Sequence, residues 1–166
     1  METGEDKSTL ILLDRVDSTN TYAKNNFHSL ADGCTVAAIE QYAGRGRLGR
    51  KWIASAGDSL CATAVLKHVE QPFHAGIITG LAGLELIREY IPDKFVFFKW
   101  PNDIYVNECK IAGILSEGVL EKGELLGVVS GIGINVNQDA SLMEAVENPA
   151  TSLAVQAKKN FFLEKI

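Results

Sequence analysis

The stretch FVFFKWPNDIYVNECKIAGILSE, residues 95–117, decides the fold class, because it predicts short strands with only turns between them. Aromatic and β-branched residues favour a strand over residues 95–100, which Pro101 ends. Two more strands are expected at residues 104–106 and 111–117, with a polar turn at residues 107–109. Connections this short join antiparallel neighbours, so we expect a mostly antiparallel sheet.

The pattern extends in both directions from this stretch. A polar turn at residues 121–124 predicts a hairpin between residues 111–117 and 125–136. Upstream, Pro72 begins the clearest helix, residues 72–91, whose apolar side chains keep helical spacing and predict one face packed on a sheet. Further strands are predicted at residues 9–16, 34–40 and 60–66, and shorter helices at residues 21–28 after cap residues 17–20, at residues 151–157, and from residue 161 with Asn160 as its cap.

Some six or seven strands with few helices between them do not alternate as β-α-β units. We therefore predict an α+β fold, in which a mixed, mostly antiparallel sheet carries helices mainly on one face. The length of 166 residues favours a single domain over residues 1–166.

Composition excludes several classes of protein. A formal net charge of −5 and a pI of about 5.2 argue against a protein that coats nucleic acid. Three cysteines, Cys34, Cys61 and Cys109, lack C-x-x-C spacing and predict neither a disulfide framework nor a zinc cage. The first residues are polar, and no stretch approaches the roughly 20 apolar residues of a membrane span. We expect a cytoplasmic protein without a membrane partner.

The loop GRGRLGRKW, residues 44–52, is the first candidate for a site. It carries four cations separated by glycines, which let a backbone approach a ligand closely. Arginines bind phosphate or carboxylate oxygens through paired hydrogen bonds, so the loop favours an anionic ligand. The ordinary alternatives are a solvated basic loop or a nucleic-acid contact. No Gly-Lys-Ser/Thr follows, so it is not a Walker A loop.

Three more motifs are weaker alone. In KWPND, residues 99–103, the proline presents an amide and a carboxylate that suit Mg²⁺ or a ribose, although it is also an ordinary turn sequence. In KIAGIL, residues 110–115, a lysine opens an apolar strand and needs an anionic partner unless it reaches solvent. In GIGINVN, residues 131–137, glycines on one strand face suit a flat ring, a bulge or tight strand packing.

Together and in this order, these motifs resemble the biotin–protein ligase family. STN at residues 18–20 and Glu40-Gln41 before the glycine loop also fit its pattern, and the resemblance covers roughly residues 9–157. It implies the class II synthetase-like catalytic fold of biotin and lipoate ligases. It also implies an enzyme that uses ATP to form biotinyl-5′-AMP and then transfers biotin to a lysine of a biotin carboxyl carrier protein of the acetyl-CoA carboxylase type.

The resemblance also implies roles for individual residues. The residues expected to act in catalysis are Arg47, Lys110 and Arg45. Those expected to bind biotin are Ser18, Thr19, Asn20, Gln41, Arg45, Gly46, Arg47, Lys110, Gly113 and Gly133. Those expected to bind ATP and the adenylate are Arg47, Arg50, Trp52, Asn102, Asp103, Lys110 and Asn135, and Asp103 is also expected to bind Mg²⁺.

Departures from the family pattern keep alternatives open. Leu48 replaces an arginine of some members. From the resemblance we also expect residues 1–166 to lack the last helix and the small C-terminal β-barrel domain of full-length members, and the helix-turn-helix domain of some bacterial members. We therefore expect no DNA partner, and a homodimer is an open expectation. The alternatives to a biotin–protein ligase are a lipoate–protein ligase and a non-catalytic biotin-binding module.

Overall fold

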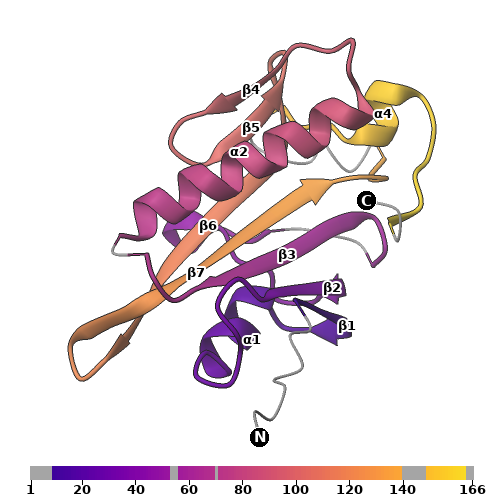
Figure 1. The fold of residues 1–166 in the computed structure, drawn as a ribbon. Helices are drawn as coiled ribbons and strands as arrows, with labels where there is room; N and C mark the ends of the chain where they lie inside the picture. The colour runs from indigo at the N-terminus through magenta and orange to yellow at the C-terminus, as the bar shows by residue number, and fades with distance from the viewer. Residues whose placement is uncertain (1–8, 53–55, 70, 140–148, 164–166) are drawn as a thin grey trace, which may run out of the picture.

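Seven strands form one mixed sheet in the order β1-β2-β3-β7-β6-β5-β4 (Figure 1). The structure, a computed structural model, describes residues 9–52, 56–69, 71–139 and 149–163. β1 and β2 run parallel and the other neighbours antiparallel, so the α+β class with a mixed, mostly antiparallel sheet is confirmed. The strands are β1 Leu10–Val16, β2 Thr35–Gln41, β3 Ser59–Leu66, β4 Val96–Lys99, β5 Asp103–Val106, β6 Cys109–Glu121 and β7 Glu124–Asn135.

The β6–β7 hairpin is the longest part of the sheet. At its turn, Lys122 and Gly123 have φ angles of 52° and 89°, as a type I′ turn requires, which confirms the turn predicted at residues 121–124. β6 extends beyond the predicted residues 111–117 at both ends, because β5 pairs with its first two residues and β7 pairs with it as far as the turn. Where β6 pairs with β5, Asp103 lies opposite Gly113, which brings two of the sequence motifs together.

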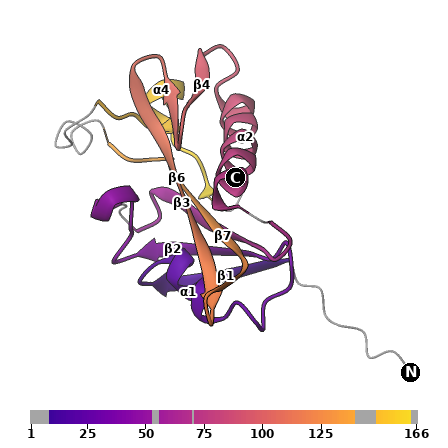
Figure 2. The ribbon, with the colours of Figure 1, turned by 90° about the vertical axis from the view of Figure 1, so that its left-hand side faces the viewer.

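The two longer helices pack on opposite faces of the sheet (Figure 2). α2, Pro72–Tyr90, packs on a core cluster that Ile132 of β7 joins, whereas α1, Thr19–Asn25, packs on a cluster containing Val129 of β7. Even and odd residues of a strand point to opposite faces, so the sheet separates two layers. The prediction of helices mainly on one face does not extend to α1. None of the helices in the described ranges is both long and apolar enough to cross a membrane.

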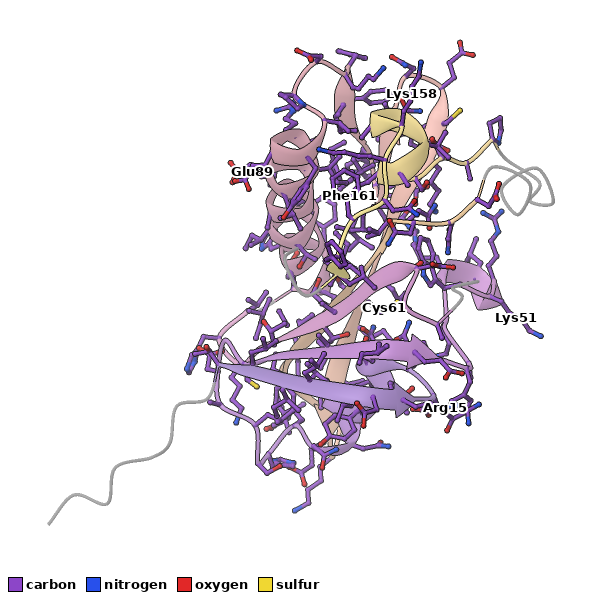
Figure 3. The ribbon with its side chains drawn as sticks, turned by 90° about the vertical axis from the view of Figure 1, so that its right-hand side faces the viewer. Arg15, Lys51, Cys61, Glu89, Lys158 and Phe161 are labelled. Atoms are coloured by element: carbon purple, nitrogen blue, oxygen red, sulfur yellow. The ribbon has the colours of Figure 1, made fainter. Side chains whose placement is uncertain are left out.

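The end of the chain departs from its predicted helices. α4, Leu153–Ala157, lies inside the predicted residues 151–157, but Phe161 and Phe162 are not helical. The Asn137 side chain accepts from the Phe161 N–H and donates to its carbonyl, both at 2.8 Å, which holds this backbone outside a helix. The Phe161 ring packs edge-on against Tyr90 of α2 at 5.4 Å (Figure 3). Residues 164–166, the rest of the predicted helix, lie outside the described residues.

Candidate active site

One cavity of about 220 Å³ brings together the four motifs that the sequence singled out. The start of α1 and the end of β2 form one wall, and the short helix η1, Arg47–Gly49, lies in the loop above it. β5, β6 and β7 form the floor. The lining residues are Ser18, Thr19, Asn20, Gln41, Arg45, Gly46, Arg47, Leu48, Arg50, Lys51, Trp52, Asn102, Asp103, Lys110, Gly113, Ile114, Leu115, Gly131, Ile132 and Gly133.

The wall formed by α1 and β2 is polar and buried. Thr19 and Asn20 are 3% and 4% exposed, although both lie in the first turn of α1. Gln41, at the end of β2, accepts from the backbone N–H of Thr19 through Oε1 at 2.7 Å. Thr63 of β3 reaches both α1 residues with its hydroxyl group, at 2.7 Å each. A neutral, hydrogen-bonding end of the cavity is therefore held by a helix and two strands.

Two glycines of β7 make room for this arrangement. A Cβ at Gly131 would collide with Asn20 Oδ1, and a Cβ at Gly133 would collide with the Trp52 indole. The sequence had suggested a flat face suited to a ring, and the ring that lies there belongs to Trp52 of the chain itself. Gly113 of β6 borders the same indole and the Lys110 side chain. The floor of the cavity is thus a layer of glycines covered by the protein's own side chains.

The opposite end of the cavity is cationic. Arg47 donates to Asn102 Oδ1 at 2.8 Å, which joins the glycine loop to the turn before β5. Lys110 forms an ion pair of 2.6 Å with Asp103, and its ammonium lies 5.7 Å from the centre of the Trp52 ring. Arg45, Arg50 and Lys51 lie on the same lining, so positive groups outnumber Asp103, the one carboxylate that the described part of the lining contains. This end therefore suits a ligand that carries more negative charge than the Asp103 carboxylate.

Glu117 of β6 anchors the glycine loop from below. Its carboxylate accepts from Arg45 at 2.8 Å and Asn20 at 2.9 Å, and Lys24 lies 3.5 Å away. Burial raises the pKa of the Glu117 carboxyl, but the hydrogen bond from Asn20 and the charges of Lys24 and Arg45 outweigh it, so the pKa is lowered overall. The Arg45 guanidinium, for which the resemblance implied a catalytic and biotin-binding role, is therefore paired with Glu117 in this structure.

Cys61 of β3 lies close to this site but offers no nucleophile (Figure 3). Burial raises the pKa of its thiol to about 11, despite contacts with Gln41 and Trp52 that lower it. The three cysteines are free, as expected from their spacing. A covalent enzyme intermediate on Cys61 is therefore unfavourable, because the thiol stays protonated at neutral pH.

The match to a family model is decisive for the identity of the fold. The model described as the biotin/lipoate A/B protein ligase family matches residues 12–135. The chain belongs to this family. The predicted resemblance and the catalytic fold it implied are thereby confirmed, and the matched residues contain three of the four motifs in full and residues 131–135 of the fourth.

Relatives within the family carry more specific names. The bifunctional ligase/repressor BirA of Escherichia coli (strain K12) is 36% identical over 134 residues, which are 79% of this chain and 41% of that protein. The biotin–[acetyl-CoA-carboxylase] ligase of Paracoccus denitrificans is 35% identical over 148 residues, 86% of this chain and 61% of that one. The chain thus spans about half the length of these relatives.

Solved structures agree with the fold. Biotin protein ligase from Aquifex aeolicus in complex with biotin and ATP superposes with a TM-score of 0.79 at 34% identity, covering 95% of this chain and 65% of that one. Biotin protein ligase from Leishmania major in complex with biotinyl-5-AMP gives a TM-score of 0.70 at 28% identity, covering 90% and 64%. Ligands of these kinds are bound by the same family fold elsewhere.

The structure brings together the predicted family residues with one exception. Asn135 does not line the cavity, and its Nδ2 donates to the Thr151 carbonyl at 3.0 Å. The residues given individual roles did not include Gly131 and Lys51, although both belong to motifs that the sequence had singled out. Sequence reasoning also missed Thr63 and Glu117, which only the strand register places beside α1.

The cavity offers few side chains that could coordinate Mg²⁺. Among the described residues, Asp103 is the one carboxylate on the cavity lining, and it is paired with Lys110. Across the described ranges, no group of three or more histidine, cysteine or acidic side chains is placed to hold a metal. One carboxylate fits Mg²⁺, which keeps several waters and binds substrate phosphates in sites of this kind.

Proposed function

We propose that the chain is the catalytic part of a biotin–protein ligase, which forms biotinyl-5′-AMP from biotin and ATP and transfers biotin to a lysine of a biotin carboxyl carrier protein. The observation that carries this proposal is the two-ended cavity. Its neutral end presents Thr19, Asn20 and Gln41, and its other end presents Arg47 and Lys110. Biotin has the matching form, with a neutral ureido ring at one end and a carboxylate at the other.

The cationic end supplies what the first step needs. A biotin carboxylate oxygen attacks the α-phosphorus of ATP, a new P–O bond forms, and pyrophosphate leaves. Both reactants are anions, so their repulsion is the main barrier to contact. Lys110 and Arg47 project from a strand and a loop on either side of Asn102 and Asp103, where they would stabilise accumulating negative charge. Mg²⁺, when held by Asp103 and the phosphates, would neutralise further charge.

The second step needs no nucleophile from the enzyme. The acceptor lysine amine attacks the acyl carbon of the mixed anhydride, the C–N bond forms, AMP leaves, and the amine loses a proton. Nothing in the cavity lining resembles a Ser-His-Asp or Cys-His group, and burial keeps the Cys61 thiol protonated. The cavity's task is to hold the adenylate and exclude water until the lysine arrives.

The polar wall favours biotin over the lipoyl group. The ureido ring of biotin offers N–H and C=O groups to Thr19, Asn20 and Gln41, whereas the dithiolane ring of lipoic acid offers neither. Desolvating those wall groups against a ring that cannot bond them is costly. Calorimetry with each vitamin tests this preference, and tighter binding of lipoate would reverse it.

The activity as a whole is tested with one reaction. The chain is incubated with biotin, MgATP and a biotin carboxyl carrier domain, and the mass of the carrier is measured. We expect the mass to rise by one biotinyl group. Biotin-dependent ATP–pyrophosphate exchange separates an enzyme from a non-catalytic biotin-binding module, because the module would bind biotin without exchange.

The remaining proposals concern the setting of the reaction. We propose a cytoplasmic protein with ATP, biotin and the carrier as partners, and a homodimer in solution. Relatives named ligase/repressor carry a second function, but the net charge of −5 on this chain gives no support for DNA as a partner. Ultracentrifugation and a DNA-binding assay would test the last two points.

A further inference from the structure

The indole of Trp52 lies on the glycine floor between the two ends of the cavity. Gly113 of β6 and Gly133 of β7 are direct partners across the two strands. A Cβ at Gly133 would collide with Cε2, Cζ2 and Nε1 of the indole, and a Cβ at Gly113 would lie 3.0 Å from its Cζ3. One ring therefore covers both glycines, and only a glycine at residue 133 leaves it room.

The position of this ring matters because the floor joins the two ends of the cavity. On one side, Gly131 borders Asn20 of the polar wall, and Gly133 follows two residues later on the same face of β7. On the other side, a Cβ at Gly113 would lie 3.2 Å from the Nζ of Lys110. A molecule that reaches from the polar wall to Lys110 must therefore cross the floor where the indole lies.

Only weak contacts hold the ring there. The Lys110 ammonium lies 5.7 Å from the ring centre, a cation–π contact, but it is also paired with Asp103. The indole Nε1 is buried, yet no group in the described ranges accepts a hydrogen bond from it. Burial raises the pKa of the neighbouring Cys61 thiol and its contact with Trp52 lowers it, but that contact does not have hydrogen-bond geometry. A buried donor without an acceptor is costly, so the ring is poorly stabilised in this position.

The cavity is also small while the ring lies on its floor. Its volume is about 220 Å³, below the roughly 300–1,000 Å³ of pockets that bury a drug-sized molecule. Trp52 is the bulkiest of the described side chains that line it, so moving the indole frees the most room. The Trp52 backbone is fixed at the base of the glycine loop, where its N–H donates to the Gly44 carbonyl at 2.9 Å. We therefore expect the side chain to rotate while the backbone stays in place.

We infer that Trp52 is a gate, whose indole competes with biotin for the glycine floor and rotates away from it when biotin binds. The inference rests on the proposed function for the identity of the ligand. Biotin reaches from the polar wall, which takes its ureido ring, to Lys110, which takes its carboxylate, so it lies across Gly113 and Gly133. Rotation frees the Lys110 ammonium from the ring for that carboxylate, and it exposes Nε1 to water, which accepts its hydrogen bond.

The fluorescence of Trp52 follows the ring directly. Trp100→Phe removes the other of the two tryptophans, which is exposed and does not line the cavity. When biotin is added to this variant, we expect the emission maximum to shift to longer wavelength and quenching by acrylamide to increase, because the indole moves from a covered floor into water. A ring that stayed in place as a wall of the site would become less accessible. An unchanged emission maximum, or a shift to shorter wavelength, at saturating biotin would overturn the inference.

The rate of association provides a second measurement, made with radiolabelled biotin and rapid filtration. If the ring leaves the floor in about a tenth of the molecules or fewer, Trp52→Ala should bind biotin about tenfold faster, because every molecule is then open. Trp100→Phe is the matched control and should bind at the wild-type rate.

The outcomes separate the gate from the proposed function. Association of Trp52→Ala no faster than that of wild type would overturn the gate, and if this variant does not fold, Trp52→Phe takes its place. Biotin that binds while the ring stays on the floor would overturn the gate alone. If neither wild type nor Trp52→Ala binds biotin, the proposed function fails and the gate fails with it.

Discussion

The two ends of the cavity are built in different ways. Thr19, Asn20 and Gln41 lie on a helix and a strand, and each is tied to its neighbours by more than one hydrogen bond. Arg47 lies on the glycine loop and pairs with Asn102, and Lys110 lies near the start of β6 and pairs with Asp103. The polar end is therefore rigid and suited to recognition, whereas the cationic end can exchange its internal partners for an anionic ligand.

The largest expected effect is at the cationic end. Lys110→Ala removes the ammonium nearest the expected phosphate and leaves Asp103 without its partner. We expect adenylate formation to fall by about 10²–10³-fold or more, as when one preorganised donor to a transition state is removed. Biotin-dependent ATP–pyrophosphate exchange measures it, and Lys94→Ala, outside the cavity, is the control. Exchange at the wild-type rate would exclude the proposed role of Lys110.

Arg47→Gly should separate binding of biotin from retention of the adenylate. The Arg47 guanidinium reaches the Asn102 side of the cavity and not the polar wall, so the variant should bind biotin within a few-fold of wild type. The adenylate should leave about 100-fold faster, because a charge-assisted contact to its phosphate is lost. Stopped-flow release of preformed adenylate measures this, and Arg15→Gly on the exposed end of β1 is the control. An unchanged release rate would mean that Arg47 is misassigned.

Gly131→Ala tests the rigid end. Its Cβ would collide with Asn20 Oδ1 in a position with no free space, so Asn20 or α1 must shift. We expect a loss of stability of about 1–3 kcal/mol and weaker biotin binding. Gly46→Ala is a close control for stability alone, because a Cβ there first meets an atom at 3.5 Å, an ordinary contact. Equal melting temperatures for both variants would show that the polar wall is not rigid.

The sequence predicted the fold well where local patterns carried the information. Strand positions, the turn at Lys122 and Gly123 and the long helix α2 follow from periodicity and turn chemistry. The layer formed by α1 was missed, because a seven-residue helix shows little periodicity and its burial depends on β3 and β7. Helices that depend on tertiary packing are those for which local pattern is least informative.

The sequence predicted which residues line the site better than it predicted which of them contact one another. The resemblance named Arg45, but the pairing of its charge with Glu117 depends on where β6 passes beneath the loop. Thr63 has no sequence signal, since a threonine in an apolar strand is common. Asn135 was predicted to bind the adenylate, but it lies two residues beyond Gly133 on β7, does not line the cavity, and donates to the Thr151 carbonyl. Registers and distances of this kind come only from the assembled sheet.

The smallest expected effect concerns Glu117, which connects the two ends of the cavity. Its carboxylate accepts hydrogen bonds from Asn20 of the polar wall and from Arg45 of the loop. Glu117→Gln keeps the shape of the side chain but removes its charge. The pKa of Glu117 is held below its ordinary value, so the carboxylate stabilises the fold fully above that ordinary pKa and loses its contribution as the pH falls through the lower folded-state pKa. The pair is partly exposed, so we expect the variant to be less stable by ~1 kcal/mol or less at pH 7.

The difference in melting temperature between wild type and Glu117→Gln should therefore be largest near neutral pH and disappear in acid. Glu121→Gln, four residues further along β6, should show little difference at either pH, because its carboxylate is exposed and lies 3.9 Å from an exposed His28. Trypsin adds a second measurement, because it cleaves after the arginines of the loop and Glu117 holds the first of them. Faster cleavage of Glu117→Gln at neutral pH would show that the anchor couples the two ends. Unchanged cleavage together with a pH-independent melting difference would show that Arg45 and Asn20 act separately.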